Sequence, residues 1–176
     1  MKAIERTGVD YYIQVSDVRL IQKIVRSIDA TPGVQVVCIN IGAAMGTSTL
    51  AMLEARPNTI VYSIDIADCP LETEALEQSD IKDWQERYIF SKGKSQEIGA
   101  TWCPRSADFI FVDGGHSYQD CYEDGRIWYN VLKPGGYMAF HDYGADMLAE
   151  IKPAVDAVTE MLGMQFVEHE GKLIVF

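Results

Sequence analysis

Two short segments rich in carboxylates and imidazoles carry the groups best suited to chemistry. The apolar run 107–112 leads into Asp113 and His116, and the apolar run 137–140 leads into His141 and Asp142. If both runs are parallel strands, their carboxyl ends border the same ligand crevice, and two carboxylates and two imidazoles converge there. An imidazole with an ordinary pKa near ~6.5 accepts a proton at neutral pH without further tuning. The convergence favours catalysis at this edge of a sheet.

A glycine turn marks the second candidate site. Residues 37–50 read VCINIGAAMGTSTL, an apolar run that turns at Gly42 and Gly46 and continues as a helix. Such a turn leaves free backbone N–H groups at a helix N-terminus, where nucleotide-like ligands bind. Asp65 ends the next apolar run nineteen residues after Gly46, and a carboxylate at this spacing can hold two ribose hydroxyls. The two features predict a ribose-bearing cofactor.

The glycine pattern discriminates among such cofactors. A dinucleotide fingerprint requires G-x-G-x-x-G, whereas this turn has Ala44 at the place of a middle glycine. The looser G-x-x-x-G turn, preceded by Asn40 where Glu or Asp is usual, resembles the first motif of class I S-adenosylmethionine-dependent methyltransferases. The resemblance implies S-adenosyl-L-methionine as cofactor. It assigns that cofactor to Asn40, Gly42, Ala43, Gly46, Thr47, Ser48, Asp65, Ile66, Ser95 and Asp113.

The stretch 111–142 carries a more specific resemblance. With FVDGGHSY at 111–118, LKPGGY at 132–137 and HD at 141–142, it resembles class I methyltransferases related to the catechol-type and macrolide-sugar O-methyltransferases. In metal-dependent relatives, the residues at the positions of Asp113, His141 and Asp142 hold one Mg²⁺ that binds substrate hydroxyl oxygens. Because His suits Mn²⁺ better than Mg²⁺, the resemblance implies Mg²⁺ or Mn²⁺. His116 stands at the place of a catalytic lysine, so the resemblance makes His116 and Asp113 the catalytic residues.

Strand-like and helix-like segments alternate along the chain. We expect a leading helix within 10–30, strands at 34–41, 60–65, 88–91, 107–112 and 137–141, and helices at 46–56, 71–86, 117–131 and from about Pro153. Lys133-Pro134-Gly135-Gly136 should end helix 117–131, and Glu170-Gly171 should form the turn of a closing hairpin. These elements predict an α/β fold with a doubly wound, Rossmann-like, mostly parallel seven-stranded sheet and a C-terminal antiparallel hairpin.

The composition limits the classes of function. At 176 residues and 48% hydrophobic content, the chain fits one domain, with residues 1–33 as a leading helix and 34–176 as the cofactor-binding core. A formal charge of −11 opposes binding to nucleic acid. The four cysteines include no C-x-x-C pair, and no basic leader or membrane-length apolar run occurs. We therefore expect a cytoplasmic enzyme with a small-molecule substrate and no nucleic-acid or membrane partner; a homo-oligomer is left open.

Structural roles compete with several of these assignments. The glycines can serve close helix packing alone, and loop or capping roles are open to Ser95, Asp113 and Ser117. His116 can instead pack under helix 117–131. We expect Asp124 on a helix surface and the aromatic residues of that helix in the core, namely Tyr122, Trp128 and Tyr129. Two functional alternatives are a non-catalytic cofactor-binding or assembly subunit with the same fold, and an NAD(P)-dependent oxidoreductase.

Overall fold

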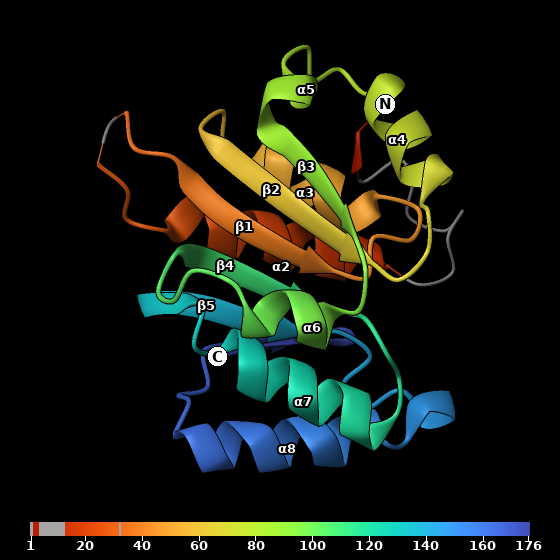
Figure 1. The fold of residues 1–176 in the computed structure, drawn as a ribbon, viewed down its shortest axis with the longest axis vertical. Coiled ribbons are helices and arrows are strands. Elements are labelled where there is room, and N and C mark those ends of the chain that lie inside the picture. Colours follow the sequence, from red (N-terminus) through yellow and green to blue (C-terminus); the bar gives the residue numbers. More distant parts are fainter. Residues whose placement is uncertain (1, 4–12, 32) are drawn as a thin grey trace.

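A seven-stranded sheet forms the centre of the protein (Figure 1). The computed structural model describes residues 2–3, 13–31 and 33–176. The strands lie in the order β3-β2-β1-β4-β5-β7-β6. Their bounds are β1 Val36–Ile41, β2 Thr59–Asp65, β3 Tyr88–Lys92, β4 Ala107–Val112, β5 Leu132–Phe140, β6 Glu168–Glu170 and β7 Leu173–Val175. β1 to β5 run parallel, whereas β7 is antiparallel to β5 and β6, so the predicted fold is confirmed.

Helices cover both faces of the sheet. In Figure 1, α6, α7 and α8 lie together on one side, and α2 and α3 lie behind the sheet. The helices are α2 Val15–Ser27, α3 Thr47–Ala55, α4 Pro70–Glu77, α5 Trp84–Arg87, α6 Ser95–Ala100, α7 Tyr118–Trp128 and α8 Ile151–Leu162, with a short 3₁₀ turn at Asp146–Leu148. None of the helices in the described part of the chain is long and apolar enough to span a membrane.

The core has two halves because successive strand residues point to opposite faces. Cys38 and Phe109 pack with buried residues of α2 and α3. Their neighbours Ile39 and Ile110 pack on the other face, with buried residues of α7 and α8. This continuous burial explains why the central strands are apolar along their whole length rather than alternating with polar residues.

The carboxyl ends of the central strands are held side by side. The backbone N–H of Gly42 donates to the Ile64 carbonyl at 2.9 Å, and that of Asp113 donates to the Ile41 carbonyl at 2.9 Å. The N–H of His141 donates to the carbonyl of Val112 at 3.0 Å. Because the order of connection reverses between β1 and β4, this edge contains the topological switch point at which open α/β sheets bind ligands.

Several element boundaries differ from the predicted ones. Lys133-Pro134-Gly135-Gly136 was expected to precede the fifth strand, but β5 already begins at Leu132, which pairs with Ala107. The register shift between Ala107 and Phe109 accommodates the Pro-Gly-Gly segment as an irregularity within the strand. The predicted helix 71–86 is two helices, α4 and α5. Ser79 Oγ bonds the Leu76 carbonyl and the Ile81 N–H between them, and such local bonds compete with helix continuation.

The two ends of the chain also need correction. Of the predicted leading helix 10–30, the structure gives α2 from Val15 to Ser27, and residues 10–12 lie outside the described residues. The hairpin turn is shifted by one residue to Gly171-Lys172, because Glu170 pairs with Leu173 in the ladder. The short helix α6 was not predicted, since its six residues are too few to establish a helical period.

Candidate active site

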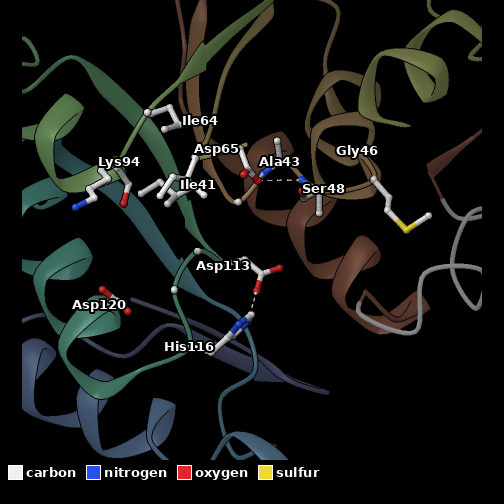
Figure 2. Close-up of a pocket in the computed structure, with 18 of the residues that line it drawn as sticks. Ile41, Ala43, Gly46, Ser48, Ile64, Asp65, Lys94, Asp113, His116 and Asp120 are labelled. Atoms are coloured by element: carbon white, nitrogen blue, oxygen red, sulfur yellow. Dashed lines mark hydrogen bonds and ion pairs between the residues drawn. The ribbon is translucent and has the colours of Figure 1, made fainter. Parts of the chain in front are cut away.

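A cavity of about 610 Å³ lies at the carboxyl ends of β1, β2 and β4 (Figure 2). A volume of this size is typical of small-molecule sites. Most residues that the resemblance assigns to the cofactor line it, namely Gly42, Ala43, Gly46, Thr47, Ser48, Asp65, Ile66, Ser95 and Asp113. His116 lines the cavity too, whereas Asn40, His141 and Asp142 are not among its lining residues.

Gly42 is required by the close approach of two strand ends. Its φ is +91°, and a Cβ atom there would lie 2.0 Å from the backbone oxygen of Asp113. Gly46 also has a positive φ, of +81°, and immediately precedes α3. The glycines therefore do allow close packing, as the structural alternative expects. The turn that they permit also places Thr47 and Ser48 on the cavity wall.

Asp65 joins the end of β2 to the glycine loop. Its Oδ2 accepts hydrogen bonds from the backbone N–H groups of Ala43 at 3.0 Å and Ala44 at 3.4 Å, and its Oδ1 accepts from the N–H of Ala67 at 2.9 Å. Figure 2 shows this carboxylate beside Ala43 at the cavity. A carboxylate fixed by several backbone donors is held in one orientation toward a ligand.

Asn40 is completely buried and serves the interior of the protein. Its Oδ1 accepts from Ser48 Oγ at 3.1 Å. Its Nδ2 donates to Thr49 Oγ1 at 2.9 Å and to Ser63 Oγ at 3.3 Å. The amide thus links β1, β2 and α3 behind the glycine loop. The resemblance implies instead that this residue contacts the cofactor directly.

Glu72 is a buried carboxylate in the same network that sequence reasoning missed. It accepts hydrogen bonds from Thr49 Oγ1 at 2.6 Å, Ser63 Oγ at 2.8 Å and the Tyr88 hydroxyl at 2.7 Å. Burial raises the pKa of Glu72 and outweighs these three bonds. The only signal in the sequence was its spacing, because Glu72 precedes Ala75 and Leu76 by three and four residues and so shares their buried helix face.

The predicted convergence of two carboxylates and two imidazoles is present at the ends of β4 and β5. His141 Nδ1 lies 3.3 Å from Asp113 Oδ1 and 3.6 Å from Asp142 Oδ1. His116 Nε2 lies 3.3 Å from Asp142 Oδ2 and 3.7 Å from Asp113 Oδ1, and Figure 2 shows it pointing at Asp113. Ligand atoms of Asp113, His141 and Asp142 all lie within 4.8 Å of one another, close enough to share one metal ion.

The charges of this cluster shift one another's pKa values. Burial raises the pKa of Asp113 and Asp142, but the neighbouring imidazoles outweigh burial, and the pKa of each carboxyl is lowered. A hydrogen bond to Asp113 and another to Asp142 raise the pKa of His116 to about 9, against the effect of burial. The expectation of an untuned imidazole was therefore wrong, since His116 carries its proton at pH 7 in this environment.

A family model described as a methyltransferase domain matches residues 39–143. The chain belongs to the methyltransferase domain family. The match spans the glycine loop, Asp65 and the complete cluster of carboxylates and imidazoles. Together with the sheet order and the closing hairpin, it makes the chain a class I S-adenosylmethionine-dependent methyltransferase, and it removes the basis for an NAD(P)-dependent oxidoreductase.

Two solved structures share the fold of this chain, and one further protein matches a short part of its sequence. A Staphylococcus aureus structure provisionally assigned as a caffeoyl-CoA O-methyltransferase has a TM-score of 0.72 at 16% identity, covering 97% of this chain and 88% of that chain. The Burkholderia thailandensis 1,6-didemethyltoxoflavin-N1-methyltransferase, solved with S-adenosylhomocysteine, has a TM-score of 0.64 at 16% identity, covering 90% and 76%. An uncharacterised Acanthamoeba polyphaga mimivirus protein is 34% identical over 56 residues, which is 31% of this chain and 25% of that protein.

In this methyltransferase, Asp124 is a buried residue, and its predicted place on a helix surface was wrong. Asp124 Oδ1 accepts a hydrogen bond from Ser95 Oγ, so α7 holds the first residue of α6 at the cavity edge. Burial raises the pKa of Asp124 to about 6. The prediction followed the residue type and not the helical period, since Asp124 lies three residues after Cys121 and four before Trp128, on the buried face of α7.

Ser117 and the aromatic residues of α7 have the structural roles that were expected as alternatives. Ser117 caps α7, because its Oγ accepts from the backbone N–H of Asp120 at 3.1 Å. Trp128 is fully buried, and Tyr122 and Tyr129 are partly buried against the same core. These aromatic side chains therefore stabilise the fold and do not line the cavity.

Proposed function

We propose that the chain transfers a methyl group from S-adenosylmethionine to a hydroxyl oxygen of a small molecule, with help from a divalent cation. The observation that carries the proposal is the meeting of Asp113, His116, His141 and Asp142 beside a cavity whose other wall is the glycine loop. A proton acceptor and metal ligands beside the cofactor are the groups that metal-assisted methyl transfer to a hydroxyl uses.

The cavity suits the cofactor in size and in its polar groups. S-adenosylmethionine supplies an electrophilic methyl group on a sulfonium sulfur. The amino-acid end would lie against the loop 42–46, Asp65 would hold the ribose hydroxyls, and Ser95 would lie near the adenine end. In support, Asp65 has an orientation fixed by backbone N–H groups, and all of these residues line one cavity.

The donor set beside the cavity fits a divalent cation. The side chain of His141 is completely buried, and its Nδ1 has no hydrogen-bond partner among the described residues although it faces Asp113 and Asp142. A buried nitrogen without a partner is costly unless a ligand satisfies it. One nitrogen and two carboxylate ligands suit Mn²⁺ at least as well as Mg²⁺. When bound, such a cation lowers the pKa of a substrate hydroxyl.

His116 would accept the hydroxyl proton. The substrate oxygen forms its bond to the methyl carbon as the carbon–sulfur bond breaks, and S-adenosylhomocysteine leaves. His116 must first be neutral, and positive charge bound at Asp113 and Asp142 would lower its raised pKa toward neutrality. Alignment of the two reactants could contribute ~7–11 kcal/mol to the rate.

Turnover tests the proposal directly. Purified protein with isotopically labelled S-adenosylmethionine is offered catechols, sugars with adjacent hydroxyls, and matched amines, with Mg²⁺, with Mn²⁺ or with EDTA. We expect O-methylated product, supported by Mn²⁺ at least as well as by Mg²⁺ and abolished by EDTA. Full activity in EDTA contradicts the metal, and methylated amines alone contradict oxygen as acceptor.

A non-catalytic subunit is the second candidate. Asn40 favours it, because the amide carries no charge and its hydrogen bonds are made inside the protein. Calorimetry that detects cofactor binding, combined with no turnover on any substrate class, would support this alternative.

A further inference from the structure

A third carboxylate lies behind His141, on the side away from Asp113 and Asp142. Asp17 Oδ2, from the first turn of α2, is 3.3 Å from His141 Nε2, and both side chains are completely buried. The ring therefore has one nitrogen toward Asp17 and the other, Nδ1, toward the two carboxylates near the cavity. The two residues are 124 positions apart in the sequence.

The carboxylate of Asp17 is held in place from two directions. Its Oδ2 accepts a hydrogen bond from the backbone N–H of Gln14 at 2.8 Å, as part of the capping box at the N-terminus of α2. Its Oδ1 lies 3.4 Å from the backbone N–H of Lys172 in the hairpin turn. The preceding turn residue, Gly171, packs so closely that a Cβ built on it would lie 2.8 Å from Asp17 Oδ1. Asp17 thus has little freedom to turn away from the ring.

This arrangement sets which nitrogen of a metal-bound His141 carries the proton. Carboxylates face both ring nitrogens, but a cation shared by Asp113 and Asp142 would exclude a proton from Nδ1 and leave the ring proton on Nε2, facing Asp17. The lone pair then lies on Nδ1, the buried nitrogen without a hydrogen-bond partner among the described residues. Histidines that bind metals commonly donate their second ring N–H to a carboxylate in this way, and this bond fixes the ring and makes it a stronger ligand.

We infer that Asp17 is a positioning residue for a divalent-cation site formed by Asp113, His141 and Asp142, acting by holding His141 with Nδ1 free to bind the ion. The inference rests on the metal assistance proposed above. The new element is that the ligand His141 works as a pair with Asp17. In this pair, the buried carboxylate of α2 supplies negative charge that the imidazole itself lacks.

Metal affinity, measured without cofactor or substrate, tests the inference. In titrations with Mn²⁺ alone, Asp17→Asn should weaken binding about 10- to 100-fold, the usual effect of losing such a partner. S-adenosylmethionine affinity should change less than threefold. Asp108→Asn is the matched control, since Asp108 also accepts from a backbone N–H, that of Val37, but lies at the start of β4, away from the cluster. It should leave Mn²⁺ affinity unchanged.

A second substitution separates positioning from general damage to the fold. In a His141→Asp background there is no ring to orient, so adding Asp17→Asn should cause no further loss of Mn²⁺ affinity. An equal loss in both backgrounds, or unchanged affinity in Asp17→Asn alone, would overturn the inference. If wild-type protein binds S-adenosylmethionine but no metal ion, the metal site is refuted, and the inference about Asp17 with it. If the protein binds the metal ion but transfers no methyl group, the proposed function is refuted, and the Mn²⁺ titrations still decide the role of Asp17.

The tautomer of His141 provides a readout that needs no variant. In ¹⁵N-histidine-labelled wild-type protein loaded with diamagnetic Zn²⁺, NMR should place the His141 ring proton on Nε2 and the metal-bound lone pair on Nδ1. A proton on Nδ1 in the metal-loaded protein would overturn the inference even if Asp17→Asn fails to fold.

Discussion

Asp65 Oδ2 accepts a hydrogen bond of 3.0 Å from the backbone N–H of Ala43, which ties the end of β2 to the loop that follows β1. The same carboxylate lines the cavity at the position proposed for the ribose. Asp65 therefore shapes the glycine loop, and in the proposed complex the same carboxylate would also present acceptors to the cofactor.

Replacing Asp65 with Ala should weaken S-adenosylmethionine binding by about 1.5–3 kcal/mol, the range for hydrogen bonds to a charged group. Calorimetry on the folded variant measures the loss. Asp68→Ala is the control, because Asp68 pairs with Lys92 at the surface and is not a lining residue of the cavity. Unchanged affinity in folded Asp65→Ala would remove Asp65 from the cofactor site.

Gly42→Ala should disrupt both the fold and the cofactor site. The new Cβ would overlap the backbone oxygen of Asp113, and it would also force alanine into a left-handed conformation. Gly163 has a positive φ of +65° as well, but no atom lies within 4 Å of a Cβ built there. Gly163→Ala should therefore cost about 1–2 kcal/mol, and Gly42→Ala at least about 1–3 kcal/mol more. Equal losses in denaturant unfolding would show that the strand ends can separate without cost.

Replacing His116 with Gln keeps its size and removes its basicity. The methyl-transfer rate should fall ~10²–10⁴-fold, while cofactor affinity stays within a factor of about three. His169→Gln, on the exposed hairpin, should leave the rate unchanged. Parental turnover in His116→Gln would make His116 structural.

The charge of His116 can be measured separately. In metal-free protein, an NMR titration should give a pKa of about 9, because the imidazole bonds Asp113 and Asp142. Asp142→Asn should lower that pKa because it removes a negative charge beside the ring. Saturation with Mg²⁺ should lower it too, because the cation adds positive charge there. A pKa that ignores both changes would mean that His116 does not face the cluster in solution.

Asp124 should make stability depend on pH between about 4 and 7. Burial raises its pKa from 3.8 to about 6, so its contribution to stability is present at low pH and is lost as pH rises through about 6. The free energy of unfolding of the parent, minus that of Asp124→Asn, should therefore fall by up to about 3 kcal/mol over this range. Ser95→Ala removes a hydrogen bond that lowers this pKa, so the loss should move to higher pH. A constant difference across the range would show that Asp124 ionises normally.

Local sequence patterns predicted the five parallel strands, the closing hairpin, most of the helices and the position of the cavity. A strand, a glycine turn and a helix are contiguous in the chain, so the turn at Gly42 and Gly46 could be predicted from 14 residues. The place of Asp65, Asp113 and Asp142 at strand ends followed in the same way, because the carboxyl ends of parallel strands share one edge. Periodicity describes only such local relationships, and for this reason the boundaries at Leu132 and Ser79 were missed.

The tertiary structure decided which polar side chains are buried and what they contact. Glu72 and Asp124 bond Tyr88 and Ser95, which belong to other elements, and helical spacing cannot identify these partners. The raised pKa of His116 depends on the approach of Asp142 from the next strand. Asp17 meets His141 across 124 residues, a contact that exists only once α2, β5 and the closing hairpin have packed together. Proximity between distant segments sets these charges and tautomers, and no spacing within the sequence encodes it.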